Sequence, residues 1–589
     1  MTRFRKLLLP ISILFVVGFS IYAFNFHNRL FWDDDDWIVN NAYVHDFSHV
    51  KEIFTKNILS GFGLNSNYYR PLLLLSFAFN YVINGVTPFG YHLLSNGFHI
   101  ANGILIFLLL LYAFKRKLPA FLAALLFLIH PLQTEAVTYV SGRGDPMSVF
   151  FMLLALWLFI KTVGNQTFRK WICLALSLVS MILAILSRET AVLLPALLMV
   201  FYIAFLSDEK FWKSVGKSFI RSLPYWGITI IYGILRLTVL NFKNTLNFYS
   251  QANEYTQHLS YRLYTFGHAL FEYFKLIFAP LNLHMERNLP VNTSFFQWPV
   301  WLVGLAVLGL LVLLWVLYKK RRPVPAHNPN FKVWFFAWAW FFVSMAPVSG
   351  IVPINALMYE HWLYLPLIGL FALAGFYLDK LFSYAKSKSV ALFYALAVIL
   401  AVYFCFFAVV SIQRNILWGK PVEFYNDILK YDPTSVRILN NLGNTYSAEG
   451  DLKNAADAYQ KAILSPDGSN FAQPYYNLGN VYRDMGNTGK ATEEYKNAIK
   501  IDPNFPFAYQ NLAVIYANQG DLNNAALMLE KVKELKPSEL AVYYNLGLVY
   551  MAQNKKDLAA ENFNIALKLS ANNPQITAEI KTILEKLGK

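Results

Sequence analysis

Charged residues are scarce in this sequence: Asp, Glu, Lys and Arg make up 15% of its 589 residues, whereas 56% are hydrophobic. Cysteine is almost absent, and the two that occur, Cys173 and Cys405, both fall inside apolar stretches. The shortage of charge excludes an ordinary soluble enzyme, because a water-exposed surface needs more of it. The shortage of cysteine argues against a disulfide framework or a zinc site, and it leaves the redox compartment undetermined.

The excess of positive charge is confined to one part of the chain. The formal net charge is +16, but residues 437–589 hold 16 basic and 16 acidic side chains. The whole excess therefore lies in residues 1–436, where Lys and Arg occupy short loops between apolar stretches. This is the pattern of membrane topology and not of a compact basic face, so we predict no nucleic-acid partner.

Apolar stretches long enough to cross about 30 Å of hydrocarbon recur as far as residue 411. We predict eleven spans, near residues 7–25, 92–114, 118–134, 147–162, 171–187, 191–207, 222–240, 298–318, 332–350, 363–379 and 389–411. Basic clusters mark every second loop, at Arg3 to Lys6, Lys115 to Lys117, Arg169 and Lys170, Lys210 to Arg221, Lys319 to Arg322 and Lys380 to Lys388. By the positive-inside rule these loops and the N-terminus are cytoplasmic, and the odd count places the C-terminal part on the other side.

Two apolar segments need a separate interpretation. The first span follows basic residues like a signal peptide, but no small-residue cleavage site is evident, so we expect a retained signal anchor. Residues 259–284 carry Glu272 and Lys275 among apolar residues. Because ionisable groups are costly at the middle of a bilayer, we expect an interfacial or re-entrant helix there.

The C-terminal part contains an internal repeat with a period near 34 residues. A Leu-small pair recurs at spacings of 36, 34 and 34 residues, at Leu442-Gly443, Leu478-Gly479, Leu512-Ala513 and Leu546-Gly547. A turn residue and an alanine follow in each copy, at Gly450 and Ala455, Gly486 and Ala491, Gly520 and Ala525, and Asn554 and Ala559. The pattern resembles the tetratricopeptide repeat and predicts a helical solenoid that binds a partner. We expect a membrane domain over 1–414, a linker and half-repeat over 415–436, four repeats over 437–573 and a capping helix over 574–589.

Four consecutive aspartates, Asp33 to Asp36, follow the first span between aromatic residues. Such interfacial positions normally favour Trp, Tyr, Lys or Arg, so carboxylates here need water, a ligand or a chemical role. A solvated loop is one interpretation. A metal site is disfavoured, because consecutive side chains on an extended chain point apart, and we expect no cofactor. The remaining interpretation is a carboxylate that acts as general base on a hydroxyl, and the sequence leaves open which of the four acts.

Other polar residues are predicted on the same side of the membrane. They are Arg70, His92, His99, His130, Glu135, Arg143, Asp145, Arg188, Glu189, Arg236, Glu360 and His361. Each one alone is more often a capped helix end or a satisfied structural group. Arginines and carboxylates gathered on one side of a helix bundle together predict a site for an anion at the membrane interface.

Several short motifs resemble those of a known family. They are Phe31-Trp32-Asp33-Asp34, Tyr69-Arg70-Pro71-Leu72, Phe89-Gly90-Tyr91-His92, His130-Pro131, Glu135-Ala136, Gly142-Arg143 with Asp145, Tyr364-Leu365-Pro366, and Arg414-Asn415 with Trp418. Together with the repeats, they resemble the transmembrane and tetratricopeptide-repeat-containing O-mannosyltransferases and their prokaryotic relatives. Those proteins are membrane-embedded glycosyltransferases of the C superfamily.

The resemblance implies an all-α fold, with a GT-C-type membrane bundle of about eleven spans followed by the solenoid. It also implies inverting transfer of a sugar, such as mannose, from a polyprenyl-phosphate donor to a protein hydroxyl. The site and repeats would be extracytoplasmic, in a bacterial periplasm or an ER lumen, and a bacterial or archaeal inner membrane is favoured. The family's acidic pair falls on Asp33 and Asp34, which the resemblance makes catalytic.

The chemistry agrees with this expectation. A phosphate leaving group needs positive charge, which Arg143, Arg188 or Arg236 can supply, and the acceptor hydroxyl needs one carboxylate as base. Two alternatives remain open at this stage. One is a non-enzymatic membrane scaffold that binds proteins through its repeats, and the other is a lipid-head-group transferase or flippase.

Overall fold

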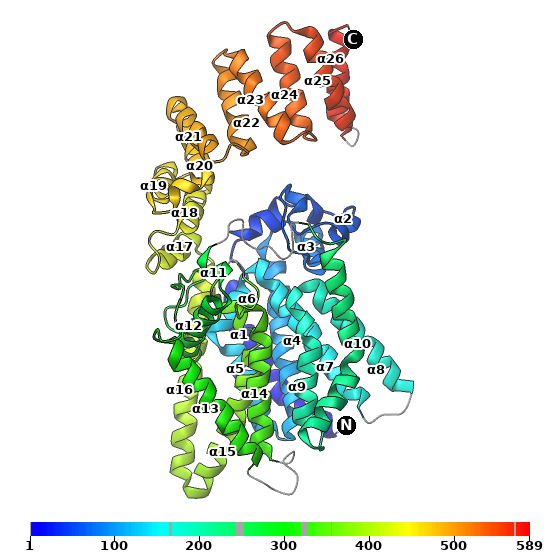
Figure 1. Cartoon of the computed structure of the whole chain (residues 1–589), viewed down its shortest axis with the longest axis vertical. Helices are drawn as coiled ribbons and strands as arrows, with labels where there is room; N and C mark the ends of the chain where they lie inside the picture. The colour runs from blue at the N-terminus through cyan, green and yellow to red at the C-terminus, as the bar shows by residue number, and fades with distance from the viewer. Residues whose placement is uncertain are drawn as a thin grey trace. The chain divides into compact units, whose positions relative to one another are not determined.

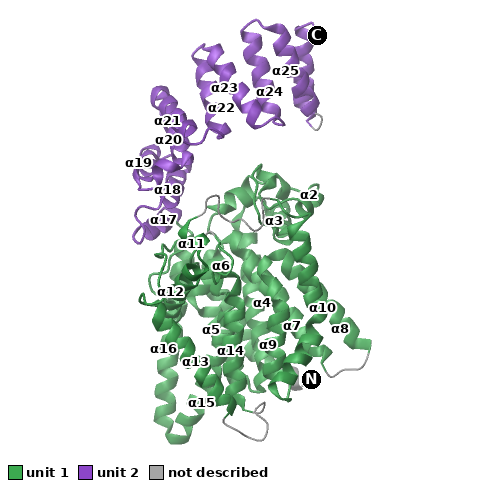
Figure 2. Cartoon of the chain, in the orientation of Figure 1, with its two compact units in different colours: residues 1–420 green, residues 421–589 purple. Residues whose placement is uncertain are grey.

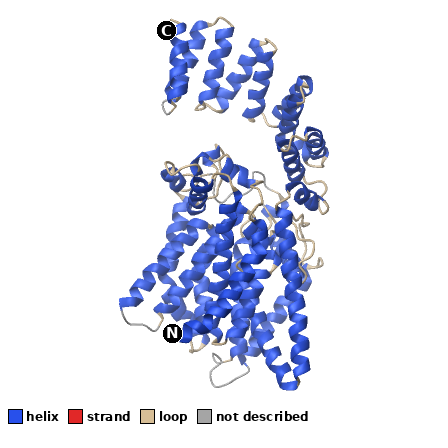
Figure 3. Cartoon of the chain, turned by 180° about the vertical axis from the view of Figure 1, so that it is seen from behind, coloured by secondary structure: helices blue, strands red, loops and turns tan. Residues whose placement is uncertain are grey.

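The computed structural model describes residues 2–163, 168–242, 253–319, 328–354, 356–570 and 573–588. The chain divides into two compact units, residues 1–420 and 421–589 (Figures 1 and 2). The described residues form helices and loops without a strand (Figure 3). The predicted fold class, a bundle of membrane helices followed by a helical solenoid, is therefore confirmed. Of the basic loop Lys319 to Arg322, all but Lys319 lies outside the described residues.

Nine helical segments in the described part of the chain are long and apolar enough to cross a membrane. They contain α1 (Thr2–Tyr22), α4 (Pro88–Phe114), α7 (Gly144–Thr162), α8 (Phe168–Ser187), α9 (Leu194–Phe201), α13 (Val300–Lys319), α14 (Pro329–Met345), α15 (Leu367–Lys388) and α16 (Val390–Trp418). A tenth is broken, because α5 (Lys117–Ile129) and the segment Pro131–Thr138 meet at an angle of 57°. Pro131 stands at the break, where it has no N–H to continue the helical hydrogen bonds.

The remaining predicted span, residues 222–240, corresponds to α10 (Phe211–Leu237), which is long enough but less apolar than the others. Its direction follows from contacts at its ends. The segment that contains α9 begins at Glu189, which bonds Arg70, and α10 returns to the same end, where Arg236 donates to the carbonyl of Asn67. The helix α10 therefore covers the height of the bundle in the direction opposite to α9.

The ambiguous stretch 259–284 contains one continuous helix, α12 (Leu259–Phe278). It is not among the helices apolar enough to span a membrane, which agrees with the expected interfacial or re-entrant helix. Arg262 in its first turn is buried and donates to the carbonyls of Gly350 and Thr256. The helix packs against α13, and in Figure 1 it lies toward the end of unit 1 opposite the N-terminus.

The segment between α1 and α4 forms a small cap at that same end of unit 1 (Figure 1). It contains η2 (Asp35–Val39), η3 (Ala42–Val44), α2 (Val50–Thr55), η4 (Ser60–Phe62) and α3 (Pro71–Asn84). Trp37 and Ile38 pack with Leu73, Phe77 and Tyr91 in one buried cluster. This packing holds the acidic run against the helix ends of the bundle.

The second unit consists of helix pairs, as the repeat pattern predicts. The pairs are α18 (Val436–Ala448) with α19 (Leu452–Leu464), α20 (Ala472–Asp484) with α21 (Thr488–Ile501), α22 (Pro506–Asn518) with α23 (Leu522–Leu535), and α24 (Leu540–Ala552) with α25 (Lys556–Leu569). Helix α17 (Pro421–Leu429) precedes them and α26 (Pro574–Lys586) follows. The four predicted turn residues all have positive φ, from +62° at Asn554 to +80° at Gly450, which explains the glycines.

The small residue of each repeat makes room for a side chain 16 residues later. A Cβ atom added at Gly479 would lie 2.7 Å from the ring of Tyr495, and Gly443 and Gly547 meet Tyr459 and Phe563 in the same way. The third repeat has Ala513, and the residue 16 positions later is the smaller Leu529. A larger residue on one helix is thus matched by a smaller one on its partner.

This matching leads to a stability prediction. In residues 421–589, Gly479→Ala should lower the free energy of unfolding by about 1–3 kcal/mol, because the Tyr495 ring has to move. Adding Tyr495→Leu should recover part of that loss, which a double-mutant cycle of urea unfolding measures. The control is Gly489→Ala in α21, where an added Cβ would lie 3.8 Å from Asn487 Oδ1, an ordinary van der Waals contact, and where helix propensity rises. If the two substitutions change the free energy of unfolding additively, Gly479 and Tyr495 are not matched in size.

Candidate active site

Asp34 is buried and ties the acidic loop to the bundle. Its side chain is 2% exposed. Oδ1 accepts from the backbone N–H and the hydroxyl of Ser141, at 2.8 and 2.5 Å, and Oδ2 accepts from the backbone N–H of Phe31 at 3.4 Å. Burial raises the pKa of Asp34 to about 7, against the opposing effect of the Ser141 hydrogen bonds. This carboxylate therefore serves as an anchor between the loop and the turn that leads into α7.

The neighbouring aspartates are in different surroundings. Trp32 has φ +65°, a strained left-handed conformation for a bulky residue, and such strain is often found at functional sites. Asp33, directly after it, is half-buried, whereas Asp35 is exposed. Burial, together with the charges of Asp33 and Asp35, raises the pKa of Asp36 to about 6. The four carboxylates are thus not equivalent, and Asp33 is the member of the family pair with the more accessible side chain.

Two arginine–carboxylate pairs lie beside this loop. Arg70 Nε is 2.9 Å from Glu189 Oε2, and Arg188 Nη1 is 2.5 Å from Asp145 Oδ2. The guanidinium of Arg70 stands 6.0 Å from the ring of Trp37 in the acidic segment. Since Asp145 also follows Ser141 by only four residues, both pairs are connected to the loop that Asp34 anchors.

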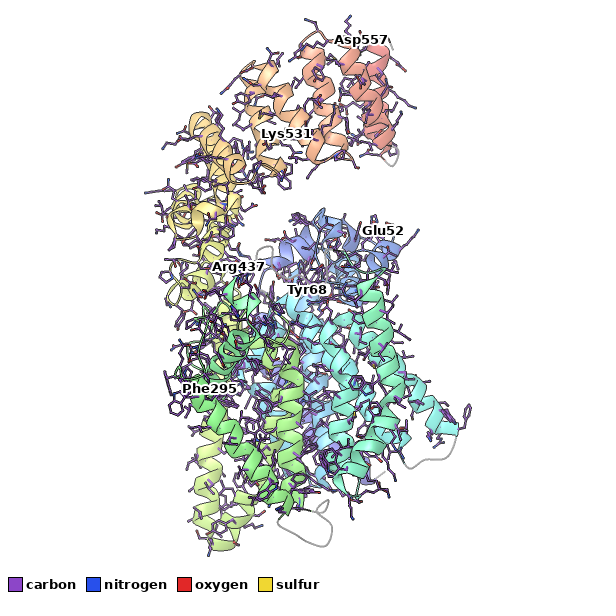
Figure 4. The ribbon with its side chains drawn as sticks, in the orientation of Figure 1. Glu52, Tyr68, Phe295, Arg437, Lys531 and Asp557 are labelled. Carbon is purple, nitrogen blue, oxygen red and sulfur yellow. The ribbon has the colours of Figure 1, made fainter. Side chains whose placement is uncertain are left out.

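An exposed aromatic side chain, that of Tyr68, packs on Arg70. Its guanidinium lies 4.6 Å from the ring centre of Tyr68. Figure 4 labels Tyr68 and Glu52 at the same end of unit 1. The arginine is therefore stacked under a side chain that reaches the surface at the cap.

A histidine–glutamate pair extends the charged group. His361 Nδ1 is 2.5 Å from Glu135 Oε1, and the backbone N–H groups of Glu360 and His361 donate to Glu135 Oε2 at 3.1 and 3.3 Å. The ring of Tyr359 stacks on the imidazole, with centroids 5.2 Å apart. Residues 226 positions apart in the sequence are therefore in direct contact.

Glu360 is the centre of a further ion-pair group. It is fully buried, and its Oε1 accepts from Arg287 at 2.7 Å and from the backbone N–H of His284 at 2.9 Å. Arg414 lies 4.0 Å from its other oxygen and donates to the carbonyl of Leu283. Arg287 was not among the predicted site residues, because it stands alone in a loop without periodicity or a motif.

Arg143, predicted to contact an anion, is fully buried and surrounded by protein acceptors. It donates to Ser95 Oγ at 3.1 Å, to Ser76 Oγ at 3.0 Å and to the carbonyl of Tyr91 at 2.9 Å. These contacts join α3, α4 and the turn before α7. The structure therefore gives Arg143 an internal, bracing position.

Two more predicted residues are also held by backbone groups. Arg236 donates to the carbonyls of Leu240 and Asn67. His130 bonds the carbonyl of Ile277 at 3.0 Å and is fully buried. The structure thus brings Arg70, Glu135, Asp145, Arg188, Glu189, Glu360 and His361 together. Arg143, Arg236 and His130 instead bond serine hydroxyls or backbone carbonyls. Their predicted contacts with a substrate stay predictions. Among the residues that the structure describes, no group of three His, Cys, Asp or Glu side chains could hold a metal ion.

The second unit matches a known repeat family. Residues 436–465, 508–539 and 540–573 match the family described as "Tetratricopeptide repeat", and residues 479–520 match "TPR repeat". The fold and these matches define a multi-span membrane protein with tetratricopeptide repeats. Among solved structures, "Crystal structure of MamA protein" covers 26% of this chain and 83% of its own, with 27% identity and a TM-score of 0.24. A structure described as "YrrB: a TPR protein with an unusual peptide-binding site" covers 35% and 97%, with 20% identity and a TM-score of 0.24.

Relatives that cover both units share the resemblance found in the motifs. The chain is 25% identical over 495 residues to "Protein O-mannosyl-transferase TMTC3" of Mus musculus, covering 78% of this chain and 52% of the relative. It is 24% identical over 470 residues to "Protein O-mannosyl-transferase F38B6.6" of Caenorhabditis elegans, covering 78% and 62%. "Protein O-mannosyl-transferase Tmtc1" of Drosophila melanogaster is 36% identical over 124 residues, which are 21% of this chain and 14% of the relative. The resemblance to this family is confirmed, and the chain spans between half and two thirds of the length of the first two relatives.

Proposed function

We propose that the chain is a membrane glycosyltransferase that moves a sugar, such as mannose, from a polyprenyl-phosphate donor to a hydroxyl of a protein, with inversion at the anomeric carbon. One observation carries the proposal: the acidic loop and the arginine–carboxylate pairs lie together at one end of the membrane unit. The Asp34–Ser141 hydrogen bonds and the contact of Arg70 with Trp37 join them. A base for the acceptor and cations for a phosphate are therefore neighbours.

The residues divide the chemistry as follows. Asp33 takes the proton of the acceptor hydroxyl as the bond between its oxygen and the anomeric carbon forms. The bond from that carbon to the phosphate oxygen breaks, and Arg70 and Arg188 stabilise the negative charge that develops on the phosphate. Glu189 and Asp145 hold the two guanidinium groups in fixed orientations. A phosphate leaves without a general acid, so the two-carboxylate arrangement of glycosidases is not required.

The transfer reaction and the role of the repeats are tested with one pair of proteins. The full chain should transfer labelled mannose from a polyprenyl-phosphate mannose to a Ser- and Thr-containing peptide and to a secreted protein. A chain ending at Lys420 should keep transfer to the peptide and lose most transfer to the protein, because the repeats raise the local concentration of the acceptor. Absence of transfer by the full chain with every polyprenyl-phosphate sugar would leave the scaffold and flippase interpretations. Equal losses on both acceptors would mean that the repeats support the membrane unit instead.

We place the site and the repeats on the extracytoplasmic face. In Figure 1 the N-terminus lies at the end of unit 1 opposite the cap. The basic residue Arg116 stands between α4 and α5, and Lys388 ends α15 just before α16. With Cys173 and Cys405 replaced by Ala, Ser48→Cys and Ser469→Cys should react with an impermeant maleimide in intact cells. Ser387→Cys, in the last turn of α15, should react only after permeabilisation. Protection of Ser469→Cys in intact cells would require an even number of crossings, most directly through α12.

A further inference from the structure

The two ring nitrogens of His361 differ in their hydrogen bonding. Nδ1 contacts Glu135, which is 0% exposed and is also held by two backbone N–H groups. Nε2 makes no hydrogen bond with any residue that the structure describes, and the side chain remains 15% exposed. The imidazole therefore has a fixed orientation with its second nitrogen directed to accessible space.

The cationic and the acidic side chains around this pair are equal in number. The charged groups that act on His361 or Glu135 come from the residue before α3, from α6, α7 and α16, from the loop before α13 and from the turns at Arg188 and Glu360. Together with Glu189, the partner of Arg70, they are four cations, Arg70, Arg188, Arg287 and Arg414, and four carboxyl groups, Glu135, Asp145, Glu189 and Glu360. Burial raises the pKa of Glu135 to about 7, against the opposing charges of Arg414 and Arg287. Tyr359 and Tyr273 are the neighbouring hydroxyl groups. Each of these arginines already has a carboxylate within 4.0 Å, so a phosphate that contacts Arg70 and Arg188 adds one negative charge in excess to the group.

The resting imidazole is neutral. Burial lowers the pKa of His361, and Arg188 and Arg70 oppose its protonation, whereas Asp145 favours it. A neutral imidazole that donates Nδ1–H to Glu135 carries a lone pair on Nε2. The oxygens of a phosphodiester are acceptors too, so they repel Nε2 in this state.

We propose that the donor phosphate binds at His361 Nε2 together with one proton, which Glu135 stabilises on the imidazole. This inference rests on the proposed function, since it assigns a third contact to the donor phosphate of that reaction. The proton comes from solvent and forms an N–H bond at Nε2, no other covalent bond changes in binding, and the acceptor's own proton still goes to Asp33. When the bond to the anomeric carbon breaks, the imidazolium already faces the oxygen that gains charge.

Binding of a non-reacting probe tests the coupling. The probe is farnesyl methyl phosphate, a prenyl phosphodiester whose single charge does not change between pH 6 and 8. Titration calorimetry of the full chain in detergent, in two buffers of different ionisation heat, should show uptake of about one proton per probe at pH 7.5. The dissociation constant should rise by up to about tenfold for each pH unit between pH 6 and 8.

Three variants test whether the pH dependence and the proton uptake belong to His361. His361→Gln keeps an amide N–H for Glu135, so it should fold, but it should bind the probe at least about tenfold more weakly at pH 6 and show no proton uptake. His361→Arg should bind as the wild type does at pH 6 and lose the pH dependence, because its charge is permanent. His268→Gln, in α12 and bonded to Asn292, should leave both unchanged.

The possible results are distinguishable from failure of the proposed function. Wild-type binding with no proton uptake, or an unchanged pH slope in His361→Arg, overturns the coupling even if sugar transfer is intact. Loss of transfer in His361→Arg at pH 6 with normal probe binding would make the imidazole a base for the acceptor and also overturn the proposal. If no polyprenyl-phosphate sugar is ever transferred, the function fails, while the calorimetry still reports whether His361 binds a phosphodiester with a proton.

Discussion

Asp33→Asn should lower kcat for sugar transfer by about 10²–10⁴, with little change in the melting temperature. The substitution removes the base but keeps the size and polarity of the side chain. Asp33 is half-buried, and it follows the strained Trp32, so its carboxylate is held at the surface of the site. Initial rates with a labelled donor and a peptide acceptor measure the effect.

Asp34→Asn provides the matched control. Its carbonyl oxygen can still accept from Ser141, but its amide group meets the N–H of Phe31, so we expect a smaller effect on rate and a change in stability. Burial raises the pKa of Asp34, so the folded state binds the proton more tightly, and wild-type stability should fall as pH rises from about 4 to 7. Asp34→Asn should remove this slope. A normal rate in Asp33→Asn would show that another group is the base.

The pair Arg188 and Asp145 should carry donor binding. Arg188→Met with Asp145→Asn removes the ion pair without leaving a buried charge alone, and it should weaken binding of a prenyl phosphodiester by about 10- to 150-fold, the equivalent of a charge-assisted hydrogen bond of about 1.5–3 kcal/mol. Arg188→Lys should retain part of the affinity, because it keeps the charge but loses the planar fork. Titration calorimetry on the detergent-solubilised chain measures both.

Arg143→Met is the contrasting substitution. It leaves the acceptors on Ser76, Ser95 and Tyr91 without their donor, so the chain should lose about 3–5 kcal/mol of stability, visible as a lower melting temperature. The part that stays folded should bind the phosphodiester normally. If Arg143→Met loses binding at full stability while the Arg188 and Asp145 double variant binds normally, the phosphate site lies at Arg143.

The repeats and the apolar helices could be predicted from the sequence, because both are local patterns. A small residue, a turn residue and an alanine recur at fixed offsets. The small residue leaves room for a side chain of the next helix, and the turn residue takes a positive φ. Membrane segments are likewise specified by length and hydropathy alone. The bend at Pro131 and the lower apolarity of α10 are the departures, and each has a local cause in proline or in basic residues.

The site needed the tertiary structure, because its properties depend on partners far away in the chain. The sequence places Asp33 beside Asp34, but only Ser141, 107 residues from Asp34, makes one of them a buried anchor. Arg143 and Arg188 look alike in sequence, yet one is enclosed by neutral acceptors and the other is paired with a carboxylate. Composition and spacing determined that this chain is a membrane bundle with repeats and which residue types meet at its interface. Burial and pairing in three dimensions decided which of those residues are enclosed by neutral groups and which are paired with carboxylates beside the acidic loop, since a charge's role depends on what surrounds it.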